Sequence, residues 1–131
     1  MAPERTRILV VEDDRDVAQL VQLLLEEEGY KVSAAVSGEA GLSNYFTYGA
    51  DLVLLDVKIP GMDGWEVCHH LRLVSTVPIV MMTGCARPAD IANGLSLGAN
   101  GYICKPFGAA ELLSCVHGVL QRHCSRPQAE S

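Results

Sequence analysis

With 131 residues, 49% of them apolar and 20% charged, the chain is long enough for one compact domain and too apolar to be disordered. Its formal net charge of −6 argues against a nucleic-acid surface, which needs a basic face. The apolar run Ile8–Val11 is too short for a signal peptide, and no stretch approaches the ~20 apolar residues that cross a bilayer, so we expect a cytoplasmic location.

Five apolar runs predict strands, and segments with helical spacing lie between them. The strands are expected at 7–11, 31–36, 51–55, 78–82 and 101–104. A first helix is expected from the apolar spacing of Val17, Leu20, Val21 and Leu24, ending near Gly29. Further helices are expected at 38–46, weakened by Gly41, at 64–74, at 87–98, and from near Gly108 to about residue 121.

The alternation of strands and helices predicts a parallel sheet with helices on both faces. The runs 7–11, 51–55 and 78–82 are almost wholly apolar, as central strands are, whereas 31–36 and 101–104 are mixed, as edge strands are. The sequence therefore predicts a single α/β, flavodoxin-like doubly wound domain with a five-stranded sheet of order 2-1-3-4-5 and five helices. We expect this domain to cover residues 1–121, and 122–131 to be a C-terminal tail or the start of a linker.

Polar side chains follow four of the expected strands, at the edge of the sheet where such folds bind ligands. In chain order they are Glu12, Asp13 and Asp14, then Asp56, then Thr83, then Lys105. Each has an ordinary explanation alone, since Asp13 or Asp14 could cap a helix and Asp56 could start a turn. Together these explanations fail, because four unrelated turns would all have to place such groups at one edge.

The types of side chain at this edge indicate the chemistry. Carboxylates that lie close together must protonate or recruit a cation, and oxygen ligands with open positions suit Mg²⁺. A bound Mg²⁺, an ammonium and a hydroxyl together neutralise the three oxygens of a phosphoryl group. A carboxylate in that position can act as the nucleophile. The residues therefore predict a metal-assisted phosphoryl acceptor.

Four runs, "ILVVEDD", "LVLLDVKIPGMDGWEV", "IVMMTG" and "GANGYICKPF", resemble the signature of CheY-like receiver domains in bacterial two-component response regulators. The resemblance covers roughly residues 6 to 121. It implies a signalling domain of a phosphorelay, located in the cytoplasm, that accepts a phosphoryl group from a sensor histidine kinase or phosphotransfer protein onto Asp56. It implies no enzyme beyond catalysis of the domain's own phosphorylation and dephosphorylation.

The resemblance also implies how the metal is held. Asp13 and Asp56 would bind Mg²⁺ directly, and Glu12 would act through water. The backbone carbonyl of Lys58 would be the third contact from the protein.

The remaining implied roles concern the switch. Thr83 would bond the phosphoryl group, and Lys105 would pair with it, with Lys105-Pro106 as a cis peptide. Tyr102 would move inward when Thr83 shifts, although a half-exposed aromatic on an edge strand explains Tyr102 equally well. The face formed by 87–98, 101–104 and the last helix would then change its preferred partner, with a homodimer as one option.

Some positions depart from the common pattern of the family. Gly84 replaces a small alanine or serine, and Lys58 and Cys85 occupy positions that vary and tune the phosphoryl lifetime. Asn100-Gly101 replaces an acidic pair, so the family pattern does not indicate which partner binds the surface at this position. We expect no membrane contact, and DNA contact only through an effector domain that is not part of this chain.

There are three alternatives to a phosphorylated receiver. A haloacid-dehalogenase-type phosphatase needs an Asp-x-Asp pair directly after a strand, but Asp56 is followed by Val57 and Lys58. A flavodoxin-like cofactor binder needs a hydroxyl- and glycine-rich loop after the first strand, where the acidic residues would repel phosphate. The third alternative is a receiver that works without phosphorylation; the full set of site residues argues against it, but the sequence does not prove that the site is used. The sequence identifies neither the kinase nor the signal.

Overall fold

The computed structural model describes residues 6–59, 61–84, 92, 95–96 and 98–130, with side chains as far as Arg122. Among the described residues there are five strands and four helices. They are β1 (Arg7–Val11), α1 (Arg15–Glu27), β2 (Lys31–Ala35), α2 (Gly38–Tyr48), β3 (Leu52–Asp56), α3 (Gly64–Val74), β4 (Ile79–Thr83), β5 (Gly101–Cys104) and α5 (Ala109–Glu130).

The strands form one parallel sheet in the order β2-β1-β3-β4-β5, which confirms the predicted topology. The register places the carboxyl ends of neighbouring strands side by side, since Val11 pairs with Leu55 and Thr83 with Cys104. β3 is buried along its whole length, whereas β2 and β5 have exposed residues, as the edge assignment predicted. The residues that follow these strands therefore meet at one edge.

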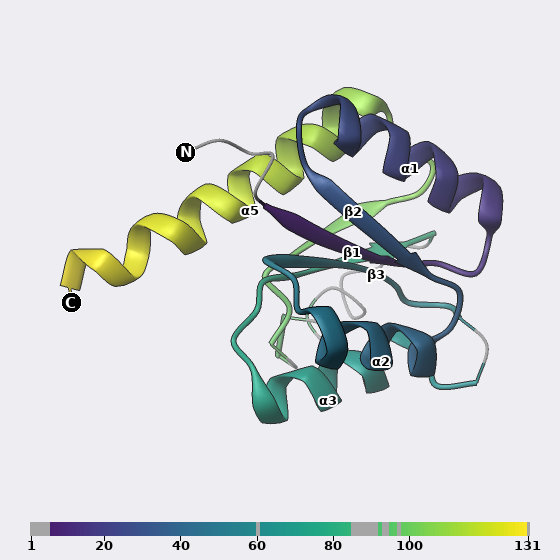
Figure 1. The fold of residues 1–131 in the computed structure, drawn as a ribbon, viewed down its shortest axis with the longest axis horizontal. Coiled ribbons are helices and arrows are strands. Elements are labelled where there is room, and N and C mark those ends of the chain that lie inside the picture. The colour runs from purple at the N-terminus through teal and green to yellow at the C-terminus, as the bar shows by residue number, and fades with distance from the viewer. Residues whose placement is uncertain (1–5, 60, 85–91, 93–94, 97, 131) are drawn as a thin grey trace.

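Helices cover both faces of the sheet, with α1 and α5 on one side and α2 and α3 on the other (Figure 1). The alternation of side chains along β1 divides the core accordingly. Leu9 and Val11 pack toward α2 and α3, whereas Ile8 and Val10 pack toward α1 and α5. Each such fully buried side chain contributes roughly 1.5–3 kcal/mol, so both faces of the central strands stabilise the sheet.

The structure shows which apolar residues of α1 are buried. Its buried residues are Ala18, Val21 and Leu25, and Leu20 is 53% exposed. The spacing of Val17, Leu20, Val21 and Leu24 predicted the helix, but α1 carries apolar residues around more than one face, so the position of the sheet decides which of them are covered. Apolar surface is consequently left exposed on α1.

Three helices begin at a polar N-cap residue in the loop that follows a strand. The Asp14 carboxylate accepts hydrogen bonds from the N–H groups of Asp16 and Val17, and Ser37 caps α2. Asp63 forms a reciprocal capping box with Glu66 at the start of α3. Each cap is worth about 1 kcal/mol. The cap of α1 is thus Asp14, and Asp13 is left for another role.

Gly41 does not interrupt α2, which runs from Gly38 to Tyr48 and so ends two residues later than predicted. A Cβ atom at Gly41 would lie 2.8 Å from Cγ2 of Val11. The glycine therefore lets α2 lie directly on β1, and this contact outweighs the roughly 1 kcal/mol that glycine costs in a helix.

The helix predicted at 87–98 lies largely outside the described residues, as does Cys85. The described part of the chain thus shows four helices where five were predicted. α5 continues past residue 121 to Glu130, and its end projects from the rest of the domain (Figure 1). Within the described ranges, no helix is long and apolar enough to span a membrane.

We predict that Gly64→Ala destabilises the fold. A Cβ atom at Gly64 would lie 2.8 Å from Cα of Val57 and would also collide with the carbonyl oxygen of Asp56. Both neighbours are backbone, so α3 must move, and we expect urea unfolding to show a loss of about 2–4 kcal/mol. Gly108→Ala is the control, because its Cβ would meet nothing within 4 Å. Equal losses in both variants would contradict the prediction.

Candidate functional site

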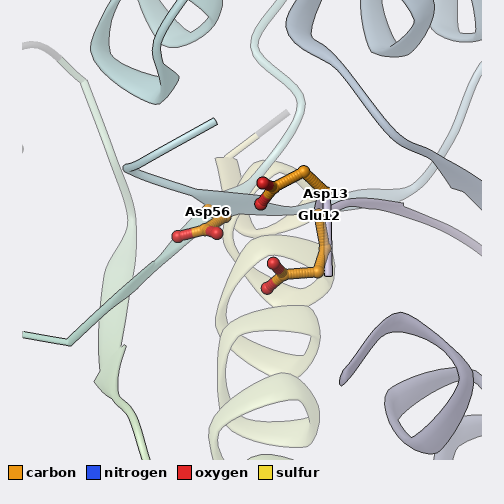
Figure 2. A group of neighbouring side chains, drawn as sticks. All are labelled: Glu12, Asp13 and Asp56. Atoms are coloured by element: carbon orange, nitrogen blue, oxygen red, sulfur yellow. The ribbon is translucent and has the colours of Figure 1, made fainter. Parts of the chain in front are cut away.

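Three carboxylates meet at the carboxyl ends of β1 and β3. One carboxylate oxygen from each of Glu12, Asp13 and Asp56 lies within 4.8 Å of the other two. Figure 2 shows the three side chains gathered at this edge, with the Asp13 carboxylate pointing toward Asp56. Glu12 and Asp56 are buried, at 1% and 4% exposure, whereas Asp13 is exposed. The predicted grouping of these residues is therefore observed.

Backbone hydrogen bonds to neighbouring strands hold the site residues just beyond the ends of their own strands. The Glu12 N–H donates to the carbonyl of Ala35 on β2, at 3.0 Å. The Lys105 N–H donates to the carbonyl of Thr83 on β4, at 2.7 Å. The site residues are thus fixed by the sheet and do not depend on flexible loops for their position.

Lys105 joins the two buried carboxylates. Its Nζ lies 2.7 Å from Oε1 of Glu12 and 3.1 Å from Oδ2 of Asp56. Burial lowers the pKa of Lys105, but the bonds and charges of Glu12 and Asp56 outweigh it and raise the pKa above its usual value. Lys105 is therefore a permanently charged ammonium placed between two acids.

Oε2 of Glu12 accepts a hydrogen bond from the Asp14 N–H at 3.1 Å. Oε1 forms the ion pair with Lys105, but it has no hydrogen-bond partner among the described residues. Burial nevertheless raises the pKa of Glu12 to about 7, and the neighbouring Asp56 acts in the same direction. The single positive charge of Lys105 therefore balances only part of the negative charge of the three carboxylates.

This donor set fits a hard divalent cation. Carboxylate oxygens are the ligands that Mg²⁺ prefers, and a cation would relieve the repulsion among the three acids. Asp13 is the best placed direct ligand, since its carboxylate is exposed and forms no hydrogen bond with the described part of the chain. Oδ1 of Asp56 accepts a bond from the Lys58 N–H at 3.2 Å, which fixes the Asp56 carboxylate on the side facing Lys58.

The other predicted site residues, Thr83 and Tyr102, lie on β4 and β5. Thr83 is the last residue of β4, one position beyond Met82, which pairs with Asp56. Tyr102 lies on β5 and is 43% exposed, so its side chain lies outside the acidic cluster. Lys105-Pro106 is a cis peptide, as predicted.

Asn100 has a local role that the sequence did not reveal. Its Oδ1 accepts hydrogen bonds from Nη2 of Arg72 and from the N–H of Ile79, both at 2.8 Å. Arg72 also donates from Nε to the carbonyl of Gly98 at 3.0 Å. The substitution noted at position 100 therefore ties the start of β5 to α3 and β4.

An apolar groove of about 320 Å³ borders the cluster, and the sequence reasoning missed it. Its lining consists of Val17 and Leu20 on α1, then Lys105, Pro106 and Phe107 after β5. The apolar spacing of α1 predicted a helix but not which of its residues stay exposed, so the groove could not be anticipated. The one available signal was the surplus of leucines on α1, which exceeds what one face can bury.

Comparison with known proteins gives a consistent result. A family model described as the response regulator receiver domain matches residues 8–117. The sensory transduction protein RegX3 of Mycobacterium tuberculosis is 41% identical over 117 residues, which is 89% of this chain and 52% of that protein. The transcriptional regulatory protein CseB of Streptomyces avermitilis is 40% identical over 128 residues, 96% of this chain and 54% of that protein. The chain spans about half the length of these curated relatives.

Solved structures show the same similarity. A two-component response regulator from Clostridium difficile superposes with a TM-score of 0.87 at 33% identity, over 92% of this chain and 99% of that one. The chemotaxis response regulator CheY4 of Vibrio cholerae gives a TM-score of 0.84 at 31% identity, over 87% of this chain and 98% of that one.

We predict a pH dependence of stability from Glu12 in protein freed of metal with EDTA. The pKa of Glu12 rises from 4.5 to about 7 on folding, so its stabilisation is complete below pH 4.5 and is lost as pH rises through 7. The loss is of the order of 1–3 kcal/mol in the free energy of unfolding.

The measurement is urea unfolding of wild type and Glu12→Gln across this pH range, because the difference between them cancels the other acids. Glu27→Gln, at an exposed position on α1, is the matched control and should follow wild type. Parallel curves for wild type and Glu12→Gln would contradict the prediction.

Proposed function

This chain belongs to the family of response regulator receiver domains, and from that premise we propose that it accepts a phosphoryl group onto Asp56 from a histidine kinase or a phosphotransfer protein. The observation that carries the proposal is a buried carboxylate at the end of β3 with an ammonium 3.1 Å away. Two further carboxylates lie within 4.8 Å of it. The domain acts in signalling, and we propose that it catalyses only its own phosphorylation and dephosphorylation.

The transfer forms one bond and breaks one. A carboxylate oxygen of Asp56 attacks the phosphorus atom, and the bond between phosphorus and the donor imidazole nitrogen breaks, with its electron pair left on that nitrogen. Lys105 neutralises charge on the incoming group, which its position beside Oδ2 of Asp56 supports. Thr83, at the end of the neighbouring strand, then bonds a phosphoryl oxygen.

We further propose that the acidic cluster is a magnesium site. Asp13 and Asp56 would hold Mg²⁺ directly, Glu12 would act through water, and the carbonyl of Lys58 would complete the protein ligands. Bound Mg²⁺ would supply positive charge to the phosphoryl oxygens. The assignment of Glu12 to an indirect role is supported by its contacts, because Oε2 accepts a bond from the Asp14 N–H and Oε1 is in an ion pair with Lys105.

The proposed output is a change at the face formed by a fifth helix at 87–98, β5 and α5. Closure of Thr83 on the phosphoryl group would allow Tyr102 to move inward, and the exposure of Tyr102 leaves it free to do so. A homodimer or an effector would then bind this face.

The limits of the domain are also a proposal. We assign the receiver to residues 1–121 and treat 122–131 as a tail or linker, because the family match ends at 117 and the last buried side chain of the described part of α5 is Val119. We propose a cytoplasmic domain that does not itself bind nucleic acid, consistent with its net charge of −6. Contact with DNA would require an effector domain outside this chain.

The apolar groove beside Lys105 is the proposed docking site of the phosphodonor. A donor histidine must reach Asp56, so its protein must bind a surface that borders the strand ends. The groove meets this condition, because Lys105 belongs both to its lining and to the acidic cluster. Its exposed Leu20 is an apolar anchor of the kind that partner helices cover.

We predict that Asp56→Asn abolishes phosphorylation. Wild type incubated with acetyl phosphate and Mg²⁺ should gain the mass of one phosphoryl group in intact-protein mass spectrometry, and EDTA should prevent the gain. Asp51→Asn is the control, since Asp51 precedes the same strand at its opposite end. A phosphoryl mass retained by Asp56→Asn would refute the assignment of the acceptor.

We predict that Leu20→Asp slows transfer from a histidine kinase by about tenfold or more, while phosphorylation by acetyl phosphate is unchanged. The small donor does not need the groove, so the two rates separate docking from chemistry. Leu23→Asp is the matched control, because Leu23 is 54% exposed on the same helix but does not line the groove. Equal slowing by both variants, or loss of acetyl phosphate reactivity, would argue against docking at the groove.

A further inference from the structure

A second hollow lies at the other end of the sheet from the acidic cluster. It has a volume of about 220 Å³ and is lined by residues from the start of β1, the start of β2 and the end of α2. The side chains that matter in its lining are Arg7, Lys31, Ser33, Asn44 and Tyr48. The receiver chemistry uses none of these residues.

Two positive charges face each other in this hollow. Arg7 and Lys31 are direct partners in the register of β1 and β2, so their Cα atoms lie on strands about 4.8 Å apart, with both side chains on one face. Like charges placed opposite each other on a sheet repel. Within the described residues, no ion pair joins either cation to a carboxylate.

Neighbouring groups offset this charge only in part. The Asp51 carboxylate accepts a hydrogen bond from the backbone N–H of Arg7 at 2.8 Å, but it does not form an ion pair with the guanidinium. The carboxyl end of α2 has no basic residue in its last turn and contributes about half a negative charge. The positive charge of Arg7 and Lys31 is therefore only partly balanced, and the pair can bind an anion even though the net charge of the chain is −6.

The rest of the lining suits a ring attached to that anion. Ser33 Oγ donates to Oδ1 of Asn44 at 3.3 Å, so the Asn44 amide nitrogen is available as a donor. The ring of Tyr48 is 65% exposed. Exposed aromatic rings stack on bases and other flat rings, with about 1–3 kcal/mol for each stacked base.

We propose that this hollow binds a small organic phosphate that carries an aromatic ring, such as a mononucleotide. The phosphate would lie between Arg7 and Lys31, and the ring against Tyr48. The volume limits the ligand to this size, since pockets for drug-sized molecules are usually about 300–1,000 Å³. The hollow is partly open to solvent, so the dissociation constant is expected at about 0.1–1 mM. The site is independent of the proposed phosphorylation of Asp56.

The test is a titration of the ¹⁵N-labelled full chain with AMP, followed by NMR in EDTA so that no metal binds the acidic cluster. Shifts should concentrate at residues 31–33 and 44–49. Arg7→Gln and Lys31→Gln should each weaken binding by about fivefold, as expected for loss of one partly exposed charged contact. Arg122→Gln, an exposed cation on α5, is the matched control and should bind as wild type.

Inorganic phosphate and adenosine separate the two halves of the ligand. Both should bind more weakly than AMP, and Tyr48→Leu should weaken AMP but leave inorganic phosphate unchanged. The proposal is overturned if AMP produces no shifts by about 5 mM. It is also overturned if the shifts fall near Glu12 and Asp56, or if Arg122→Gln weakens binding equally. Tighter binding of an acidic peptide than of AMP, dependent on Arg7, would replace the small ligand with a protein partner.

Discussion

The constraint on which the site depends is the burial of two carboxylates around one ammonium. Glu12 and Asp56 are almost fully buried, and Lys105 lies within 3.1 Å of an oxygen of each. Removing the ammonium would leave two uncompensated charges in a poorly solvated place, which typically costs several kcal/mol. The two ion pairs of Lys105 therefore connect the carboxyl ends of β1, β3 and β5 and fix the position of the Asp56 carboxylate.

The sheet supplies the rigidity that this arrangement needs. Backbone bonds from Glu12 and Lys105 to neighbouring strands extend the sheet past the ends of β1 and β5. Gly64 allows α3 to begin in direct contact with the backbone of Asp56. The backbone of Asp56 therefore lies at the end of β3 and in contact with the start of α3, and the nearby Asp13 carboxylate is exposed to solvent.

The two ends of the sheet have opposite electrostatic character. Acidic side chains gather at the carboxyl ends of the strands, and the cations Arg7 and Lys31 face each other at the amino ends. A parallel sheet makes this separation possible, because every strand contributes the same kind of end to the same edge. The charge at the acidic edge therefore favours cations, and the charge at the basic edge favours anions.

The sequence by itself determined the topology and the members of the acidic cluster. The apolar runs identified the central strands, and in a parallel sheet the residues after each run must meet, so Glu12, Asp13, Asp56 and Lys105 could be grouped without coordinates. Tertiary structure decided what periodicity leaves open. Leu20 lies outside the core because packing selects only one of the apolar faces of α1, and this creates the groove beside Lys105. Asn100 bonds Arg72, and Arg7 faces Lys31, because the fold aligns segments far apart in the chain, and no local pattern encodes such pairings.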